Sequence, residues 1–192
     1  MTAQDRSAKP HAGQTVLAEL PGDFMMWVLI ISELLVFGAA LLAFLAVRAA
    51  KPEIFAVGQA SLNATAGALN TVVLVTSGML AARALPLRRQ EERRKARFSL
   101  AAAGGLGIVF LLVKWAEYSS EFAKGIGIET SPFFTFYFLI TGFHALHVVA
   151  GIVILALVAR WDSVRNAETG IAFWHMVDLV WVLLFPIIYL LK

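Results

Sequence analysis

The sequence contains no cysteine among its 192 residues. The chain therefore has no disulfide framework, no thiolate metal site, no C-x-x-C redox pair and no C-x-x-C-H haem attachment site. Charge is also scarce, since only 15% of the residues are charged, and the net charge of +3 at pH 7 does not indicate nucleic-acid binding. Hydrophobic residues instead make up 59% of the chain, which is typical of an integral membrane protein.

Five long apolar segments, separated by clusters of charged residues, predict five transmembrane helices. Each has the roughly 20 residues needed to cross about 30 Å of hydrocarbon. Barrel strands would alternate polar and apolar residues, which these segments do not do, so helices are the expected spanning form. We predict an all-α, polytopic membrane helical bundle. Its five transmembrane helices are residues 24–47, 64–85, 98–118, 133–159 and 171–191.

Basic residues in the loops predict the orientation. Seven of them lie in residues 83–97 (RALPLRRQEERRKAR), and the N-terminal segment and the fourth loop hold two each. Cytoplasmic loops are enriched in Lys and Arg, so we expect a cytoplasmic N-terminus and a periplasmic C-terminus. A basic hairpin between two spans also suits contact with anionic lipid headgroups.

The N-terminal segment differs in composition from the rest of the chain. Residues 1–21 are mostly polar and small and lack the apolar core of a cleavable signal peptide. We expect a polar cytoplasmic tail there, followed by a single five-helix transmembrane domain over residues 22–192.

Several ionisable residues lie inside the predicted spans. A charge near the bilayer centre costs about 3 kcal/mol or more, so each is a candidate functional group. At 1.5 Å per residue, Glu33 and His144 both lie about 14 Å from the cytoplasmic side, which predicts that they pair. His144 and His147, like His175 and Asp178, are three residues apart and share a helical face. We therefore expect polar contacts among the first, fourth and fifth spans.

Three interpretations of these residues remain open from residue chemistry. His, Asp and Glu at helical spacing can ligate a metal or haem, although no Glu-x-x-His motif recurs on partner helices. A buried carboxyl can also pass protons to a histidine in a relay. The third interpretation is structural, with polar groups holding helices together or meeting a partner subunit. Residue chemistry alone favours this third interpretation.

The third span carries a possible ion pair and a glycine cluster. Lys114 and Glu117 are three residues apart near its outer end, which predicts a local ion pair rather than a catalytic lysine. Gly104, Gly105 and Gly107 follow no strand, so they form no phosphate-binding loop. We expect these glycines to permit close helix packing.

Polar and aromatic residues on two other spans suit helix packing. Asn70 on the second span is expected to form an interhelical hydrogen bond. Trp174 and Trp181 are seven residues apart on the fifth span and are expected to pack against neighbouring helices. These three residues are therefore candidates for helix packing rather than for cofactor binding.

Five sequence stretches carry a resemblance to a known family. They are WVLIISELLVF around Glu33, LNTVVLVTS from Leu69, LGIVFLLVKWAEY from Leu106, FLITGFHALHVVAG from Phe138 and FWHMVDLVWVLLFPIIYL from Phe173. Together they resemble subunit III of the haem-copper oxidase superfamily, the cytochrome c oxidase subunit III family, in its short five-helix bacterial form. Within the family the chain is most similar to members associated with nitric oxide reductase gene clusters, through LPGDFMMW, KPEIFAVGQA, WHMVDLVWVLLFP and Lys114, where many oxidase subunits have glutamine.

The resemblance implies an accessory, non-redox subunit of the bacterial cytoplasmic (inner) membrane. Such a subunit packs against the catalytic subunit I, which holds the haem and the copper or iron, and supports its proton uptake and stability. It binds no metal or redox cofactor, but phospholipid lies between its helices. The resemblance places the family's intramembrane polar positions at Glu33, His144, His147, His175 and Asp178.

The N-terminal part of the chain is expected to differ from the full-length family form. That form has two additional N-terminal helices that complete a lipid-filled cleft, and the chain before Phe24 is too short and polar to supply them.

An alternative to the subunit role stays open. The chain could instead be a free-standing proton-conducting membrane protein that uses Glu33 and His144.

Overall fold

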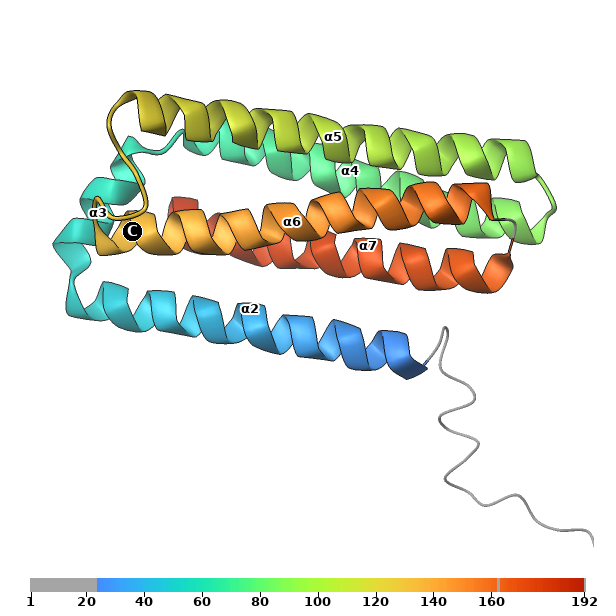
Figure 1. The fold of residues 1–192 in the computed structure, drawn as a ribbon, viewed down its shortest axis with the longest axis horizontal. Coiled ribbons are helices and arrows are strands. Elements are labelled where there is room, and N and C mark those ends of the chain that lie inside the picture. The colour runs from blue at the N-terminus through green and yellow to red at the C-terminus, as the bar shows by residue number, and fades with distance from the viewer. Residues whose placement is uncertain (1–23, 162, 192) are drawn as a thin grey trace, which may run out of the picture.

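A computed structural model describes residues 24–161 and 163–191, so the expected tail at residues 1–21 lies outside the described residues. Five long helices run along the molecule, and a short helix joins the first two (Figure 1). The last long helix continues into one π-helical turn. The helices are α2 (Phe24–Ala50), α3 (Pro52–Ser61), α4 (Ala64–Arg89), α5 (Arg93–Ala123), α6 (Pro132–Arg160) and α7 (Val164–Phe185), and the π-helical turn is η1 (Pro186–Leu190).

The predicted all-α fold with five membrane-spanning helices is confirmed. Five helices among the described residues are long and apolar enough to cross a membrane. Helix α5 is 31 residues long and extends past the predicted 98–118 at both ends. The apolar run marks the hydrocarbon layer, whereas the backbone hydrogen bonds of a helix continue into the polar flanks, and this explains the difference.

Two local features differ from an uninterrupted five-helix pattern. Helix α3 was not predicted; it begins with proline at its first position, where the missing N–H costs no hydrogen bond. At the other end of the described residues, Pro186 begins the η1 turn, because a proline cannot donate the backbone hydrogen bond that would continue α7 regularly. Gln59 of α3 donates to the carbonyl of Ile188 at 2.8 Å and so ties these two irregular segments together.

Polar side chains cap the starts of three long helices. Asn63 accepts a hydrogen bond from the backbone N–H of Ala66 at 3.0 Å, at the start of α4. Ser131 and Ser163 accept equivalent bonds at the starts of α6 and α7. These caps satisfy N–H groups that have no partner inside the helix, and they fix where each span begins.

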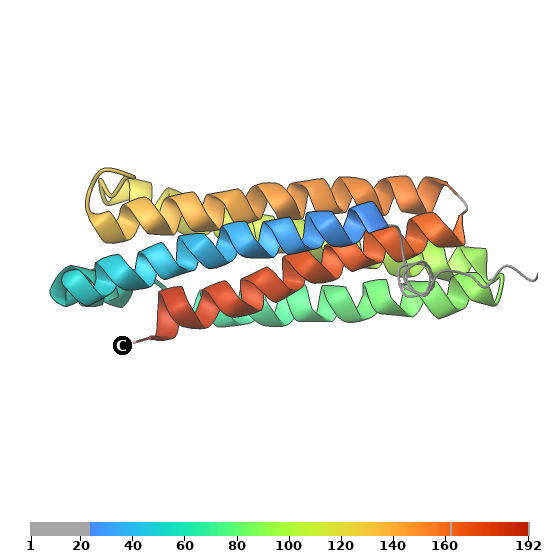
Figure 2. The same cartoon turned by 90° about the horizontal axis from the view of Figure 1, so that it is seen from below.

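The helices lie side by side with α7 inside the bundle and α2 at its edge (Figure 1 and Figure 2). In the most apolar window of each helix, 56% of α7 is buried but only 17% of α2. The main partners of α7 are α4, α6 and α2, whereas α2 packs chiefly on α6, α7 and α3. The α4–α5 and α6–α7 connections lie at one end of the bundle, and α3 and the described C-terminal end lie at the other.

Trp174 of α7 occupies a notch that three other helices form. A Cβ atom added at Gly107 of α5 or Gly151 of α6 would lie 2.7 or 2.6 Å from the indole ring. The indole N–H donates to Oγ of Ser77 on α4 at 3.1 Å, and Ser77 donates to the carbonyl of Ala103 at 2.7 Å. Glycine at both positions therefore permits the close approach that joins four helices.

Candidate functional site

Glu33 and His147 form a polar contact between the outlying helix α2 and the bundle. His147 lies on α6, and its Nε2 is 3.0 Å from Oε2 of Glu33. Both side chains are largely shielded, with 14% of His147 and 25% of Glu33 exposed. The other ring nitrogen, Nδ1, lies 2.9 Å from the carbonyl oxygen of Phe143.

The contacts of His147 differ at its two ring nitrogens. A carbonyl oxygen only accepts, so Nδ1 of His147 carries a hydrogen where it contacts Phe143. Nε2 faces Oε2 of Glu33 at 3.0 Å, and Oε2 has no hydrogen-bond partner among the described residues. The pair therefore brings an imidazole and a carboxyl group, two groups of a kind that can exchange protons, close together between two spans.

The expected pairing of Glu33 with His144 is not found, because Glu33 faces His147 instead. The depth count gave the level of each residue but not the direction of its side chain. His144 lies three residues earlier on α6, and its ring packs deeper in the bundle, between Trp181 and Phe110, and meets α2 only through the edge of Phe37. Three residues along a helix change the side-chain direction by about 60° and the depth by about 4.5 Å, which is enough to bring His147 rather than His144 to Glu33.

His144 lies in an aromatic box and is fully buried. Its ring stacks on Trp181 with centroids 5.2 Å apart and meets the edge of Phe110 at 5.6 Å and of Phe37 at 6.2 Å. Neither ring nitrogen has a hydrogen-bond partner among the described residues. The histidine therefore contributes aromatic packing here, and no described hydrogen bond links it to Glu33.

His175 and Asp178 face α4, not the first and fourth spans as expected. Nδ1 of His175 lies 3.9 Å from Oδ2 of Asp178, and the carboxylate packs on Gly78 of α4, where any Cβ would collide with it. The reason is the central position of α7, which turns this face toward α4. His175 is 45% exposed, whereas the Asp178 side chain is 11% exposed, so the aspartate is the buried member.

Asn70 and Trp181 link α4 to its neighbours. The Asn70 amide donates to the carbonyl of Phe110 on α5 at 3.2 Å, and the Trp181 indole on α7 donates to Oγ1 of Thr71 at 3.0 Å. Both bonds lie in the interior of the spans, where an unpaired polar group would be costly.

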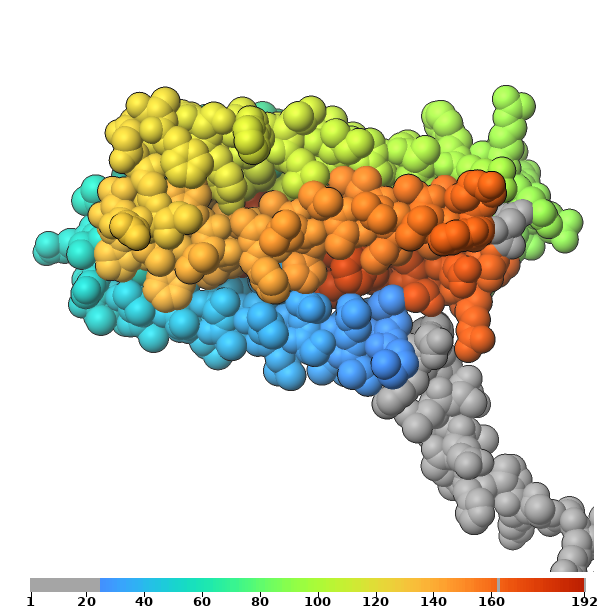
Figure 3. All heavy atoms as spheres, in the orientation of Figure 1, coloured from blue at the N-terminus to red at the C-terminus, as the bar shows by residue number. Residues whose placement is uncertain are grey.

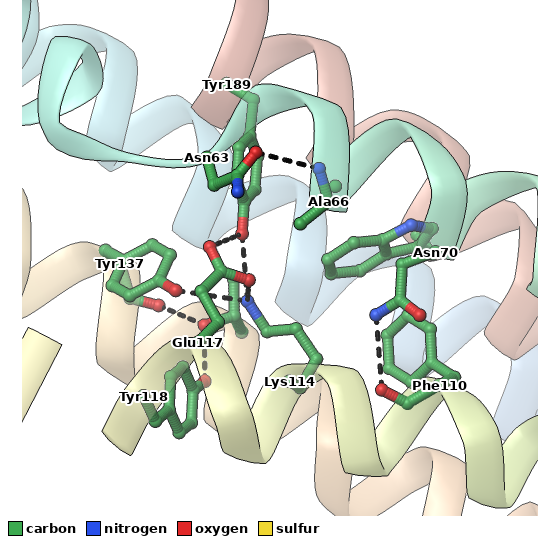
Figure 4. Close-up of polar contacts among 12 residues, drawn as sticks. Asn63, Ala66, Asn70, Phe110, Lys114, Glu117, Tyr118, Tyr137 and Tyr189 are labelled. Carbon is green, nitrogen blue, oxygen red and sulfur yellow. Dashed lines mark hydrogen bonds and ion pairs between the residues drawn. The ribbon is translucent and has the colours of Figure 1, made fainter. Parts of the chain in front are cut away.

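Lys114 and Glu117 form the predicted local ion pair, which is confirmed at 3.1 Å. The pair is buried, with 2% and 6% of the side chains exposed. Figure 4 shows both residues among the tyrosines that surround them. The ammonium group also donates to the hydroxyls of Tyr189 at 2.9 Å and Tyr137 at 3.2 Å, which uses all three of its hydrogens. Tyr189 donates in turn to the second oxygen of Glu117 at 2.7 Å. The cluster is thus fully hydrogen-bonded.

Aromatic rings enclose the ammonium group as well. Lys114 Nζ lies 4.8 Å from the ring centre of Tyr137, 5.0 Å from Tyr118 and 5.5 Å from Trp181. Cation–π attraction is strongest when the cation is desolvated, as it is here. The sequence predicted the Lys114–Glu117 pair but not the aromatic rings around it. A signal was present, because Tyr137 and Lys114 each lie four residues from the same end of their predicted spans and so at a similar depth in the membrane.

A groove of about 330 Å³ reaches the cluster from the end of the bundle where α3 lies. Glu117 lies on its wall, together with Asn63 at the start of α4 and Glu121 one turn further along α5. Glu121 pairs with Lys124 at 2.7 Å. The buried ion pair is therefore connected to the outer surface along one side of α5.

Apart from His144, the ionisable residues described above lie in pairs and not in a metal cluster. Among residues 24–161 and 163–191, no group of three or more His, Asp and Glu side chains is placed to hold a metal ion. Fold and site together define a polytopic membrane helical protein whose intramembrane charges are paired between or within spans.

The chain belongs to the cytochrome c oxidase subunit III family, whose model matches residues 9–192. It is a membrane subunit III of a respiratory haem-copper oxidase complex. Cytochrome c oxidase subunit 3 of Thermostichus vulcanus is 32% identical over 174 residues, which cover 85% of this chain and 84% of that protein. The protein of the same name from Synechocystis sp. is 27% identical over 172 residues, covering 84% and 72%.

A third relative has a different organisation. The heme-copper oxidase subunit I+III of Aeropyrum pernix is 29% identical over 185 residues. The match covers 86% of this chain but 22% of that protein. In that relative, a region similar to this chain is therefore part of a much longer polypeptide.

Proposed function

We propose that this chain is an accessory, non-redox subunit that packs against a haem-copper catalytic subunit I, stabilises it and supports its proton uptake. Haem and copper or iron are held by that partner. The observation that carries the proton role is the Glu33–His147 pair, in which a carboxyl oxygen and an imidazole nitrogen lie 3.0 Å apart between two spans. The membrane is the cytoplasmic membrane of a bacterium, with the N-terminus in the cytoplasm.

The edge helix α2 supports the idea of a neighbour. It forms a strip along the side of the molecule, in contact with the bundle on one flank only (Figure 3). Its outer face carries large apolar side chains, of which Met25, Leu35 and Leu42 are about 70% exposed. Glu33 lies on this helix, so a subunit that covers α2 would have direct access to the proton pair.

The Aeropyrum relative supports the identity of this neighbour. Its name describes subunits I and III in one polypeptide, which supports subunit I as the neighbour of this chain. Within the family, the motifs LPGDFMMW, KPEIFAVGQA and WHMVDLVWVLLFP favour the form associated with nitric oxide reductase. The catalytic partner is then a terminal oxidase or a nitric oxide reductase of the haem-copper type.

Purification of the native complex tests the partnership. The full chain is tagged at its C-terminus, extracted in mild detergent and isolated. We expect a haem-containing subunit to co-purify and to give a haem absorption spectrum, whereas a tagged, unrelated five-span protein from the same membrane should give none. If no haem-containing subunit ever accompanies this chain, the proposal is wrong.

Proton uptake is tested in the same complex with Glu33→Gln. We expect haem content to be retained and proton uptake during turnover to slow, because an amide cannot take up or release a proton as a carboxyl group can. Unchanged uptake would make the Glu33–His147 pair structural only.

The alternative, a free-standing proton conductor using Glu33 and His144, predicts a different result. Proteoliposomes that contain only this chain would then dissipate a pH gradient. We expect these proteoliposomes to keep their pH gradient, since no described hydrogen bond joins Glu33 and His144. A protonophore added at the end confirms that the gradient was present.

A further inference from the structure

A row of four charged residues on α5 leads from the buried ion pair to the end of the helix. Their spacing of three, four and three residues places them on one helical face: Lys114, Glu117, Glu121 and Lys124. Lys124 directly follows the last residue of α5, and its side chain is 50% exposed. The other three side chains are only 2–6% exposed. The row therefore connects the buried pair to the end of the bundle where α3 lies.

The groove of about 330 Å³ beside this row is mainly polar. Six of the nine described residues that line it carry polar or charged side chains: Ser61, Asn63, Glu117, Ser120, Glu121 and Lys124. By contrast, the groove of about 270 Å³ between α2 and α6 is lined by apolar residues such as Val36 and Leu139. Polar walls that leave this much room favour water, whereas apolar walls do not.

One wall of the polar groove carries a carboxylate oxygen that lacks a donor. Oε1 of Glu121 accepts a hydrogen bond from Lys124 at 2.7 Å, but Oε2 is buried and has no hydrogen-bond partner among the described residues. A buried carboxylate oxygen without a donor is costly. A water molecule in the groove would supply that donor.

We propose that water fills this groove and that the buried Lys114–Glu117 pair exchanges protons through it with the solution at the α3 end of the bundle. A proton passes from the Lys114 ammonium to the Glu117 carboxylate, which gives an amine and a carboxylic acid without a change in total charge. The acid then exchanges its proton with groove water, and the reverse transfer restores the ion pair. The route ends at Lys114 and does not cross the membrane.

The groups around the pair favour exchange through Glu117. From α6 and η1, the neutral hydroxyls of Tyr137 and Tyr189 contact the ammonium group. The residues that line the groove from α3, α4 and the turn between them are uncharged. Among the described residues, Glu117 is the carboxylate that both contacts Lys114 and lines the groove.

Labelling of single cysteines tests whether the groove holds water. The chain has no cysteine, so each variant carries one thiol. Val113 lines the groove, whereas the adjacent Leu112 is 62% exposed and does not line it. The full chain in lipid nanodiscs is treated with a water-soluble cationic methanethiosulfonate, which reacts with the thiolate that forms in water. We expect Val113→Cys to react about ten-fold faster than Leu112→Cys.

Two results of this labelling would overturn the proposal. Equal rates at the two positions would show that the groove is no wetter than the outer face of α5. If Val113→Cys is unreactive in nanodiscs and becomes reactive when detergent replaces the lipid, then lipid and not water fills the groove.

Hydrogen exchange at Lys114 tests the proton route. The full chain, labelled with ¹⁵N-lysine, is transferred to D₂O, and the Nζ signals are followed by NMR. The buried Lys114 should outlast exposed lysines such as Lys95 and Lys124. Glu117→Gln should slow its exchange about ten-fold, because an amide does not accept the ammonium proton. The control, Glu121→Gln, lies one turn further along α5 and should leave the rate unchanged.

A second pair of variants tests the route without a change of charge. Ser120→Trp fills the groove beside Glu117 and should slow exchange at Lys114, whereas Ser119→Trp lies at the adjacent exposed position outside the groove and should not. This pair also decides the question if Glu117→Gln fails to fold. Equal exchange in both variants would show that Lys114 exchanges by another route, and the proposal would fail. None of these results bears on co-purification with a haem-containing subunit.

Discussion

Nε2 of His147 lies 3.0 Å from Oε2 of Glu33, and these residues belong to spans that two other membrane helices separate in the sequence. The contact joins the edge helix α2 to α6 and gives the charged group of α2 a partner inside the membrane. The proposed support of proton uptake depends on this pair of a carboxyl group and an imidazole.

We expect Glu33→Gln to preserve the assembly of α2, because the amide can donate to Nε2 of His147. Glu33→Ala leaves that nitrogen unpaired and should lower the free energy of unfolding by about 1–3 kcal/mol. Unfolding of the purified chain in increasing dodecyl sulfate measures both. Ser32→Ala is the control, since that hydroxyl bonds only to the carbonyl of Leu29 on its own helix. Equal loss in Gln and Ala variants would mean that the carboxylate itself is needed for packing.

Lys114→Met should be strongly destabilising, by about 3–5 kcal/mol, because it leaves Glu117 as an unpaired buried charge. The double variant Lys114→Met/Glu117→Leu should recover much of this loss, since no charge then remains. The exposed pair of the same spacing, Lys95 and Glu92, provides the control, and Lys95→Met should cost less than about 1 kcal/mol. The same unfolding assay applies. Losses that simply add in the double variant would contradict a coupled pair.

Gly151→Ala tests the notch around Trp174. Its new methyl group would lie 2.6 Å from the indole ring, and overpacking of this kind costs about 1–3 kcal/mol. Gly105→Ala is the matched control, because a Cβ there meets no atom within 4 Å. We expect tryptophan fluorescence and thermal stability in detergent to change in the first variant only. A stable Gly151→Ala chain with unchanged fluorescence would show that the helices can separate at this point without cost.

Membrane orientation is tested with reporter fusions. Alkaline phosphatase fused after Lys192 should be active in the periplasm, whereas the same enzyme inserted after Gln90 in the basic α4–α5 connection should be inactive. Green fluorescent protein at the two positions should give the reverse pattern. Activity at both positions, or the opposite order, would refute the orientation that the loop charges predict.

Several features of the protein could be derived from the sequence because they depend on length and composition. An apolar run of about 20 residues must become a spanning helix, since no other form satisfies its backbone in lipid. The number of spans followed from this requirement alone. The Lys114–Glu117 pair was also predictable, because spacing within one helix fixes which side chains are neighbours.

Contacts between helices were less predictable. The depth count placed Glu33 and His144 at one level in the membrane. In the structure, α6 is rotated so that His147 faces Glu33 and His144 stacks on Trp181. Likewise, the spacing of His175 and Asp178 predicted a shared face, and only the packing of α7 on α4 decided what that face meets.

The sequence by itself determined the five spans, their apolar and charged boundaries and the neighbours within each helix, because these follow from the solvent and from helical geometry. Tertiary structure alone decided which spans meet, the burial of Lys114 within a cage of tyrosines, and the partner of Glu33. Those outcomes depend on the rotation and separation of packed helices, which are set by the fit of side chains such as Trp174 against glycine on facing helices.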